Sequence, residues 1–339
     1  MPDSTLPLGK LPAPLLDRLL QRAPVDDPSV LLGPGVGLDC AVIDTDGELL
    51  VMKSDPITFV TSELGRYLVQ VNGNDIATTG ATARWLLVTL LLPEANTTEA
   101  LVDGLMEDIY ASCREQGIAV VGGHTEITHG LDRPIAVAAL IGTVARDKLV
   151  TPRGARPADH LLLTKTVPIE GTSILARGFA QQLRTELGED DLHQARDYLL
   201  EPGISVVPDA QIALQAGEVT AMHDPTEGGL VAALWELAQA SGRSLHVDLE
   251  RVPVSDLSAR VCKVFGIDPL ATIASGSLLL STPVEHVSSI SHALEAQGIP
   301  CTDIGTVGPG PAAVYNRSQD GEVLHPRPGR DEIAKVFEG

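Results

Sequence analysis

The stretch VNGNDIATTGA, residues 71–81, decides how we interpret the fold, because it places three polar groups inside an otherwise small and apolar run. These groups are Asn72, Asn74 and Asp75. A buried polar group costs free energy unless it is paired, and a buried charge costs far more. Each of the three side chains therefore needs a polar partner, either within the protein or from a ligand.

Length and charge limit the class of protein. The chain has 339 residues, which suggests about two domains, and 44% of them are hydrophobic, as in globular proteins. The formal net charge is -21, so the surface repels nucleic acid and we predict no nucleic-acid partner. A bare nucleotide would also be repelled. An acidic cluster that binds a nucleotide should therefore do so through a divalent metal ion.

Cysteine spacing and hydropathy indicate a cytoplasmic protein. The four cysteines form no C-x-x-C pair and are typical of small buried hydrophobic residues in a reducing compartment. The N-terminal stretch lacks the apolar core of a signal peptide, and no uncharged apolar run reaches the ~18 residues that a membrane helix needs. We predict no membrane span. The cysteines are Cys40, Cys113, Cys262 and Cys301.

Hydrophobic periodicity and turn residues divide the chain into two α+β domains. Residues 151–160 combine turn formers with mixed charge, so we place the boundary there, between domains 1–150 and 151–339. In the first domain we expect helices over 11–22 and 64–79, and a third from Thr97 or Thr98 to Gly117. We expect a hairpin around Asp46-Gly47 and a buried strand over 84–93. Two further strands should cover 118–123, which enters a glycine loop, and 133–144. In the second we expect helices over 172–184 and after DPTEGG, the latter with Leu230, Leu234, Leu237 and Ala238 on one face.

Acidic residues collect at turns beside glycines. Hard divalent cations prefer carboxylate oxygens, and glycines allow the backbone to approach phosphates closely. The pattern therefore predicts a metal-bridged nucleotide site, although a single loop aspartate is more often a turn or capping residue. The acidic residues are Asp39 after GPGVG, Asp55 in KSDP, Asp75, Glu126 after GGHT, and Asp224 and Glu227 in HDPTEGG.

Other motifs are excluded or weak. No G-x-x-x-x-G-K-[ST] sequence is present, and GPGVGLD lacks the third glycine of a dinucleotide fingerprint. In HTEITH the two histidines are five residues apart, which favours a hydrogen-bonding or substrate-contacting His124 over a zinc ligand. In DPTEGGL, Asp224 or Thr226 could alternatively serve only as a helix N-cap.

Seven segments in order resemble the aminoimidazole ribonucleotide (AIR) synthetase, or PurM-like, superfamily. The resemblance covers about residues 30–310 and is greatest to the hydrogenase expression/formation protein HypE and other AIR synthase-related proteins. The segments are GLDCAVI, MKSDPITF, VNGNDIATTGA, VVGGHTEIT, TPRGARPADHLLLTKTVPIEGTSILA, MHDPTEGGLVAALWELAQASG and IASGSLLLS.

The resemblance implies a two-domain PurM-like fold and a homodimer whose N-terminal sheets join across the two-fold axis. It implies ATP and Mg²⁺ as cofactors, and activation or phosphorylation of a small-molecule acceptor. It further implies that the metal ligands are Asp39, Asp55, Asp75 and Asp224. Gly35 and Gly37 would form the loop over the phosphates, and the further nucleotide contacts would be Asn72, Asn74, Thr226 and Glu227. The catalytic candidates are Asp75, His124 and Glu126.

Three departures from the family pattern leave the acceptor open. HypE ends in a cysteine that accepts a carbamoyl group, whereas the last cysteine here is Cys301. His124 stands where HypE-type sequences usually have Asp, as in selenophosphate synthetases, and GLDCAV has one Asp where thiamine-monophosphate kinases have two. The open alternatives are an enzyme of hydrogenase maturation with a maturation partner, a small-molecule kinase of either of those types, and a nucleotide-binding partner protein without turnover.

Two further expectations concern assembly and charge. We expect the dimer to form along a strand edge near residues 86–92 or 135–143. We also expect Asp75→Asn to leave the nucleotide-free protein equally or more stable, because it would relieve repulsion in an empty acidic cleft.

Overall fold

The computed structural model describes residues 10–58, 60, 62–319 and 321–338. The chain forms two compact units. Among the described residues, the N-terminal unit comprises Asp26–Gly33 and Asp39–Leu149, and the C-terminal unit comprises 10–25, Pro34–Leu38 and the residues from Val150 onward. The break at Leu149 lies beside the boundary region predicted over 151–160, whereas the assignment of two early segments to the second unit was not predicted.

The N-terminal unit is built on a seven-stranded sheet, in which six strands follow the order β1-β2-β3-β7-β5-β6 and the seventh, β4, pairs with β7. Among the described strands of this sheet, β5 and β6 pair in parallel and the other pairs are antiparallel. The predicted hairpin is confirmed, since β2 and β3 pair antiparallel and Asp46 takes a positive φ of 61° between them. The strands are β1 Val30–Leu32, β2 Ala41–Ile43, β3 Leu49–Lys53, β4 Pro56–Ile57, β5 Thr82–Pro93, β6 Ala119–Thr128 and β7 Ile135–Val144.

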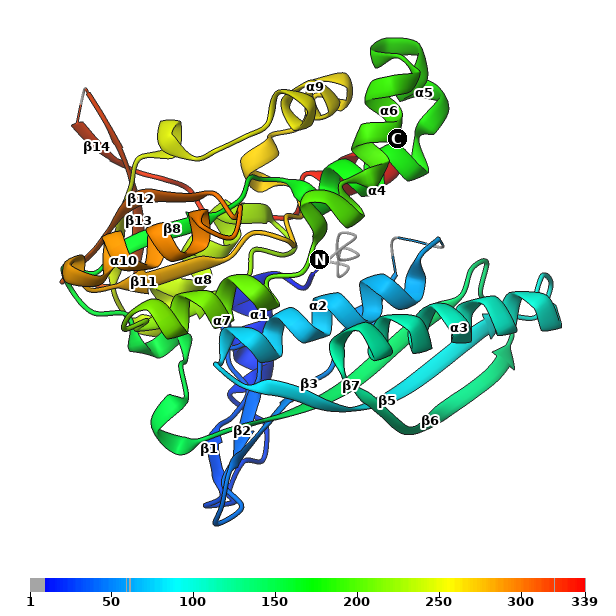
Figure 1. Cartoon of the computed structure of the whole chain (residues 1–339), viewed down its shortest axis with the longest axis horizontal. Helices are drawn as coiled ribbons and strands as arrows, with labels where there is room; N and C mark the ends of the chain where they lie inside the picture. The colour runs from blue at the N-terminus through cyan, green and yellow to red at the C-terminus, as the bar shows by residue number, and fades with distance from the viewer. Residues whose placement is uncertain (1–9, 59, 61, 320, 339) are drawn as a thin grey trace, which may run out of the picture. The chain divides into compact units, whose positions relative to one another are not determined.

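Two helices cover one face of this sheet, α2 Leu64–Thr78 and α3 Glu99–Gln116 (Figure 1). Both were predicted from the sequence. The hydroxyl of Thr98 accepts a hydrogen bond from the Leu101 N–H at 3.2 Å, which satisfies one free donor of the first turn of α3. Gly117 ends the helix in a left-handed conformation, with φ 69°.

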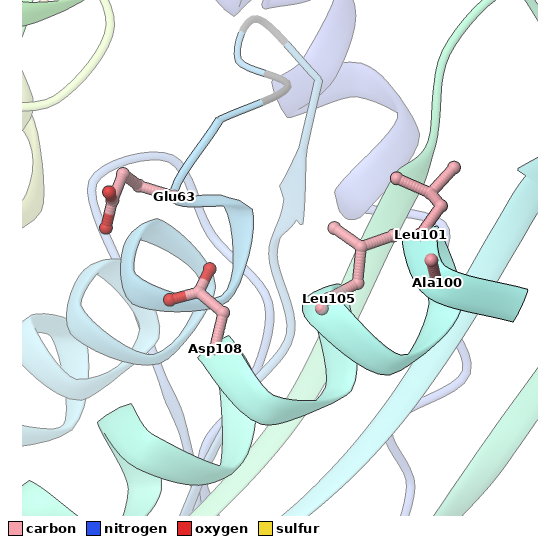
Figure 2. A pocket seen from close by; sticks show the side chains of 6 residues that line it. Glu63, Ala100, Leu101, Leu105 and Asp108 are labelled. Atoms are coloured by element: carbon pink, nitrogen blue, oxygen red, sulfur yellow. The ribbon is translucent and has the colours of Figure 1, made fainter.

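The two helices approach each other closely at Gly65. A methyl group added there would lie 2.4 Å from the backbone nitrogen of Ile109, so only glycine fits. The Gly65 N–H also donates to the Asp108 carboxylate at 2.7 Å. Figure 2 shows Asp108 on α3 and Glu63 at the start of α2. Both line a surface hollow of about 360 Å³, with Ala100, Leu101, Gly104 and Leu105.

Strand β6 differs from the expectation, because GGHTE is not a loop but part of a ten-residue strand. Gly123 has φ 149°, and a methyl group there would lie 1.9 Å from the Val88 carbonyl oxygen of β5. The glycine therefore permits close strand pairing instead of a phosphate loop.

The expected dimer edge is also corrected. Residues 86–92 lie in β5 and residues 135–143 in β7, and each of these strands is paired on both sides. The strands at the two edges are β1 and β6, and on β6 the side chains of Val121 and Ile127 are 55% and 61% exposed. The expectation that β5 would be fully buried is wrong for its first half, where Trp85 and Leu87 are exposed.

The C-terminal unit is a second α+β layer with the strand order β14-β13-β10-β12-β8-β11-β9. The predicted helix over 172–184 is interrupted at Phe179. The strands are β8 His160–Thr164, β9 Ala221–His223, β10 Ser244–Val247, β11 Leu279–Thr282, β12 Cys301–Gly308, β13 Ala313–Ser318 and β14 Gly321–Leu324. The helices are α1 Ala13–Leu20, α4 Ile169–Gly178, α5 Ala180–Leu187, α6 Glu189–Asp197, α7 Val207–Ala216, α8 Gly229–Ser241, α9 Asp256–Phe265, α10 Val284–Glu295 and α11 Ile333–Glu338.

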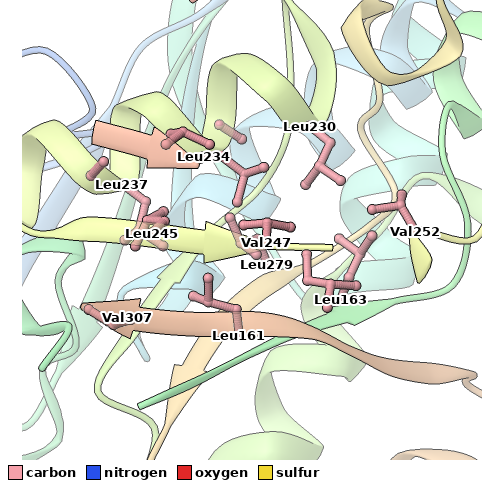
Figure 3. Packing of buried hydrophobic residues seen from close by; sticks show 14 of the residues in the cluster. Leu161, Leu163, Leu230, Leu234, Leu237, Leu245, Val247, Val252, Leu279 and Val307 are labelled. Atoms are coloured by element: carbon pink, nitrogen blue, oxygen red, sulfur yellow. The ribbon is translucent and has the colours of Figure 1, made fainter. Parts of the chain in front are cut away.

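The core of this unit lies between α8 and the sheet (Figure 3). The predicted apolar face of α8 is confirmed, since Leu230, Leu234, Leu237 and Ala238 are completely buried. They pack with strand residues such as Leu161 and Leu245. Within the described residues, no helix is both long and apolar enough to cross a membrane.

Gly65→Ala should lower the free energy of unfolding by about 1–3 kcal/mol, because its methyl group forces α2 and α3 apart. The matched control is Gly104→Ala, also within a helix but with open space around the added methyl group. It should be neutral or stabilise by up to about 1 kcal/mol. Denaturant unfolding measures both changes, and equal stabilities would contradict a tight α2–α3 contact.

Candidate functional site

Asp75 of α2 and Asp55, just after β3, converge on the ammonium group of Lys53. The Lys53 nitrogen lies 3.0 Å from an Asp55 oxygen and 3.1 Å from an Asp75 oxygen. The Asp75 side chain is only 2% exposed and that of Lys53 14%. Burial opposes the charge on Lys53, but Asp75, Asp55 and Asp39 outweigh it and hold the pKa of Lys53 well above its usual range. A charged ammonium therefore lies within the predicted acidic site.

The side-chain amide of Asn72 forms its hydrogen bonds within the protein. Its amide oxygen accepts a hydrogen bond from the Asp55 N–H at 3.0 Å, and its amide nitrogen donates to the Leu68 carbonyl at 2.9 Å. The side chain is completely buried, as is that of Asn74. Asn72 therefore fixes the backbone that carries Asp55, and its expected nucleotide contact stays a prediction, as does that of Asn74.

The donor chemistry of this cluster suits Mg²⁺, because Asp39, Asp55 and Asp75 offer hard carboxylate oxygens. The distances from the Asp55 and Asp75 oxygens to the Lys53 nitrogen, 3.0 and 3.1 Å, are typical of contacts with an ammonium group. Within the described part of the N-terminal unit, no three carboxylate, imidazole or thiolate ligand atoms lie within 4.8 Å of one another. Asp55 and Asp75 would have to move together around an ion that replaced Lys53.

His124 and Glu126 form a separate pair. Their side chains are 64% and 48% exposed and lie 3.0 Å apart on β6. Strand β6 is three positions from β3 in the sheet, which corresponds to about 14 Å. Within one chain the structure does not bring these catalytic candidates together with Asp75.

In the C-terminal unit, the DPTEGG motif forms a tight turn before α8. Asp224 is buried, and Thr226 and Glu227 are half-buried. Gly228 and Gly229 take positive φ values of 85° and 62°. Gly228 occupies the N-cap position and no side chain of the turn caps α8, so the alternative that Asp224 or Thr226 is its N-cap is wrong.

A carboxylate from the far end of the chain holds this turn. Asp331 accepts a hydrogen bond from the Gly228 N–H and another from the Ile333 N–H at 2.7 Å. Burial raises the pKa of Asp331 to about 6, although the Gly228 hydrogen bond opposes the shift. The sequence contained no local signal for this contact, because the partners are 103 residues apart.

The GPGVG segment packs on α8. Gly37 has φ 75°, and a methyl group there would lie 2.5 Å from the Glu236 carbonyl oxygen. The Glu236 carboxylate in turn pairs with His223 at 3.0 Å and with Lys10 at 3.3 Å. At Gly35 an added methyl group would meet the Leu38 side chain at 2.6 Å. The close packing on α8 explains Gly37, and a role over phosphates stays a prediction for both glycines.

Glu170 of α4 is a second titratable group that the sequence did not reveal. Burial raises its pKa to about 8; hydrogen bonding with Ser275 opposes this shift and the charge of Glu227 adds to it. The side chain is 4% exposed. A carboxyl group in this environment is largely protonated at neutral pH.

Family models match both units. Residues 37–144 match the model of the AIR synthase related protein, N-terminal domain, and residues 156–316 match that of the C-terminal domain. A protein of Methanocaldococcus jannaschii, provisionally named as a hydrogenase expression/formation protein, is 28% identical over 74% of this chain and 74% of its own length. The carbamoyl dehydratase HypE of Azotobacter vinelandii is 28% identical over 78% of this chain and 74% of its own length.

Solved structures share the fold. A hydrogenase maturation protein HypE in complex with ATP aligns with a TM-score of 0.70 and 24% identity, over 92% of this chain and 95% of that one. A chain of a HypE–HypF complex aligns with a TM-score of 0.71 and 19% identity, over 85% of this chain and 93% of that one. ThiL bound to AMPPCP and TMP gives a TM-score of 0.71 and 21% identity, over 94% of each chain.

Glu170→Gln should change how stability depends on pH. Because the folded-state pKa of about 8 exceeds the unfolded value of 4.5, the stability linked to Glu170 is complete below pH 4.5 and is lost as pH rises towards 8. The variant should therefore be more stable than the wild type at pH 8, by about 1–3 kcal/mol, and similar at pH 5. Thermal unfolding across this range measures the difference, and a constant difference at all pH values would contradict the assignment.

Proposed function

The chain belongs to the AIR synthase-related family of the PurM-like superfamily, close to HypE, and we propose that it is an ATP-dependent enzyme that phosphorylates or activates a small acceptor through Mg-ATP. The observation that carries this proposal is the Lys53–Asp55–Asp75 cluster. Burying a charged pair contributes little net stability compared with an apolar core, so a cluster of this kind favours a functional role.

In this proposal, Mg²⁺ bound to the nucleotide would neutralise the phosphate charge, and the protein would hold the nucleotide and the acceptor in position. Phosphoryl transfer depends mainly on such positioning and electrostatic stabilisation. We assign the metal to Asp39, Asp55 and Asp75 in the N-terminal unit and to Asp224 in the C-terminal unit. The proposed nucleotide contacts are Asn74, Gly35, Gly37, Thr226 and Glu227, and Asn72 positions Asp55.

The cysteines favour an acceptor that is a separate small molecule. Burial raises the thiol pKa of Cys113 and Cys301 to about 11 and that of Cys262 to about 12. A thiol with such a pKa is almost entirely protonated at neutral pH and is a poor nucleophile. This supports small-molecule activation over carbamoyl transfer to any of these three side chains.

The biological role that we propose is hydrogenase maturation with a maturation partner. The two relatives named for hydrogenase expression or carbamoyl dehydration, and the HypE–HypF complex, support it. A small-molecule kinase is the second candidate. It is supported by the protonated cysteines and by the fold shared with ThiL in complex with AMPPCP and TMP.

We also propose a homodimer that covers the β5–β6 face and edge of the N-terminal unit. Trp85 and Leu87 of β5 are 39% and 40% exposed, and Val121 and Ile127 of β6 are more exposed still. An unpaired edge strand with exposed apolar side chains is a template for pairing with another chain. A second copy provides the same edge, as two-fold interfaces require.

Mg-ATP should raise the melting temperature of the wild type by several degrees, and ATP with EDTA should not. A ligand at ~100 times its dissociation constant adds ~2.7 kcal/mol, and ~1 kcal/mol corresponds to roughly 2–4 °C at this size. Asp75→Asn should abolish most of the shift. Because Lys53 lies 3.1 Å from Asp75, the expected relief of repulsion does not apply. The nucleotide-free variant should instead lose about 1–3 kcal/mol, less than a fully broken buried pair because Asp55 remains.

The matched control is Asp132→Asn, the same change at an 83% exposed carboxylate, which should keep the Mg-ATP shift. Release of ADP or AMP in the presence of candidate acceptors then separates an enzyme from a nucleotide-binding partner protein. A wild type with no Mg-ATP shift would refute the proposed function.

Light scattering should give about twice the 35.7 kDa mass of the chain. Ile127→Glu should shift the protein towards monomer, because it places a charge on the exposed β6 edge. The control is Val323→Glu on β14, an edge strand of the C-terminal unit where the side chain is 68% exposed. A monomeric wild type at micromolar concentration, or equal dissociation by both variants, would reject this interface.

A further inference from the structure

The Lys53 cluster contains its own cation. Asp39, Asp55 and Asp75 contribute three negative charges and Lys53 one positive charge, which leaves a net charge of -2. Without metal the ammonium offsets one of the three carboxylate charges, and a divalent ion that replaces it would offset two. The formal charge of these four side chains therefore affects how strongly a metal ion binds between them.

We propose that Lys53 is a resident cation, which occupies the divalent-metal position between Asp55 and Asp75 and is displaced when the ion binds. The inference rests on the proposed metal-nucleotide function and assigns a role to a side chain outside the expected ligand set. Lys53 thus acts as a positioning residue that sets the metal affinity of the site.

Geometry makes the two cations alternatives. The Lys53 nitrogen contacts the same carboxylate groups, Asp55 and Asp75, that would ligate the ion. Mg²⁺ binds oxygen at 2.0–2.1 Å with near-octahedral geometry, so it draws carboxylates closer than an ammonium at about 3 Å does. Two cations held by the same two carboxylates would also repel each other.

The environment of Asp75 explains why a resident cation is useful. With 2% exposure, Asp75 has almost no access to water, so its charge needs a partner whether or not metal is present. Lysine suits this role because its compact charge lies on a flexible four-carbon chain that can withdraw. The same charge on Lys53 opposes the entry of a second positive ion.

The first test compares divalent-ion binding in the absence of nucleotide. Calorimetric titration with Mn²⁺ should show about tenfold or tighter binding to Lys53→Met than to the wild type, because no ammonium has to be displaced and the local charge is more negative. Lys148→Met is the control, the same substitution at an exposed lysine of the same unit. Equal or weaker binding by Lys53→Met would overturn the proposal.

Stability supplies a second readout if Lys53→Met folds poorly. Without metal the variant should melt below Lys148→Met, since Asp75 loses its ion pair with the Lys53 ammonium, and millimolar Mg²⁺ should restore most of the difference. A variant that Mg²⁺ does not rescue would show that the ion cannot replace the ammonium, and would count against the inference.

Lysine labelling tests displacement in the unmodified protein. Acetylation followed by mass spectrometry should be slow at Lys53 without metal, and at least about threefold faster once Mn²⁺ saturates the site, because the ammonium leaves its carboxylates. The rate at Lys148 should not change. An unchanged rate at Lys53 would contradict displacement.

These tests use no nucleotide, so they separate the inference from the proposed function. If Lys53→Met binds Mn²⁺ more tightly but Mg-ATP does not shift the melting temperature of the wild type, the metal site would be supported and the ATP-dependent activity refuted. If Mg-ATP shifts the melting temperature of the wild type but Lys53→Met binds Mn²⁺ no more tightly than the wild type does, the proposed function would be supported and the role of Lys53 overturned.

Discussion

The ion pair between Lys53 and Asp75 is the interaction on which the rest of the N-terminal unit depends. It joins the end of β3 to the last turn of α2, and Asn72 adds a second link from the same helix to the Asp55 N–H. A buried ion pair of this kind contributes little net stability, but it tolerates few alternative alignments of helix and strand. The polar groups that set the register of α2 are therefore the same groups that form the candidate site.

The links between β3 and α2 require α2 to be held in place from the other side as well. Gly65 lets α2 approach α3 until no side chain fits between them, and Asp108 fixes that contact through the Gly65 N–H. Helix α3 in turn has its own start and end, set by Thr98 and Gly117. Rigid helices of this kind hold functional side chains more accurately than loops do. In this unit, helix packing therefore determines where the Asp75 carboxylate points.

The sequence predicted features that depend on local chemistry and missed those that depend on distant contacts. The caps of α3 and the apolar face of α8 follow from residue types at fixed spacing, so they were predictable. The glycines before His124 have the composition of a loop, yet Gly123 serves a strand because of the neighbouring Val88 carbonyl. Acidic residues at turns predicted the carboxylates of the candidate site. The cation beside them was not predicted, although Lys53 stands two residues before Asp55, because the sequence does not show which way its side chain points.

Distant contacts also change the charge argument that began with the sequence. The formal value of -21 counts every acidic side chain as ionised. Lys53 offsets part of the charge around Asp75, while burial gives Glu170 a pKa of about 8 and Asp331 a pKa of about 6. Neutral or paired carboxylates repel an anion much less than free ones do. Repulsion of a nucleotide is therefore weaker beside Lys53 and Glu170 than the formal charge implies, and the proposed divalent ion has to offset only the carboxylates that stay charged and unpaired by Lys53.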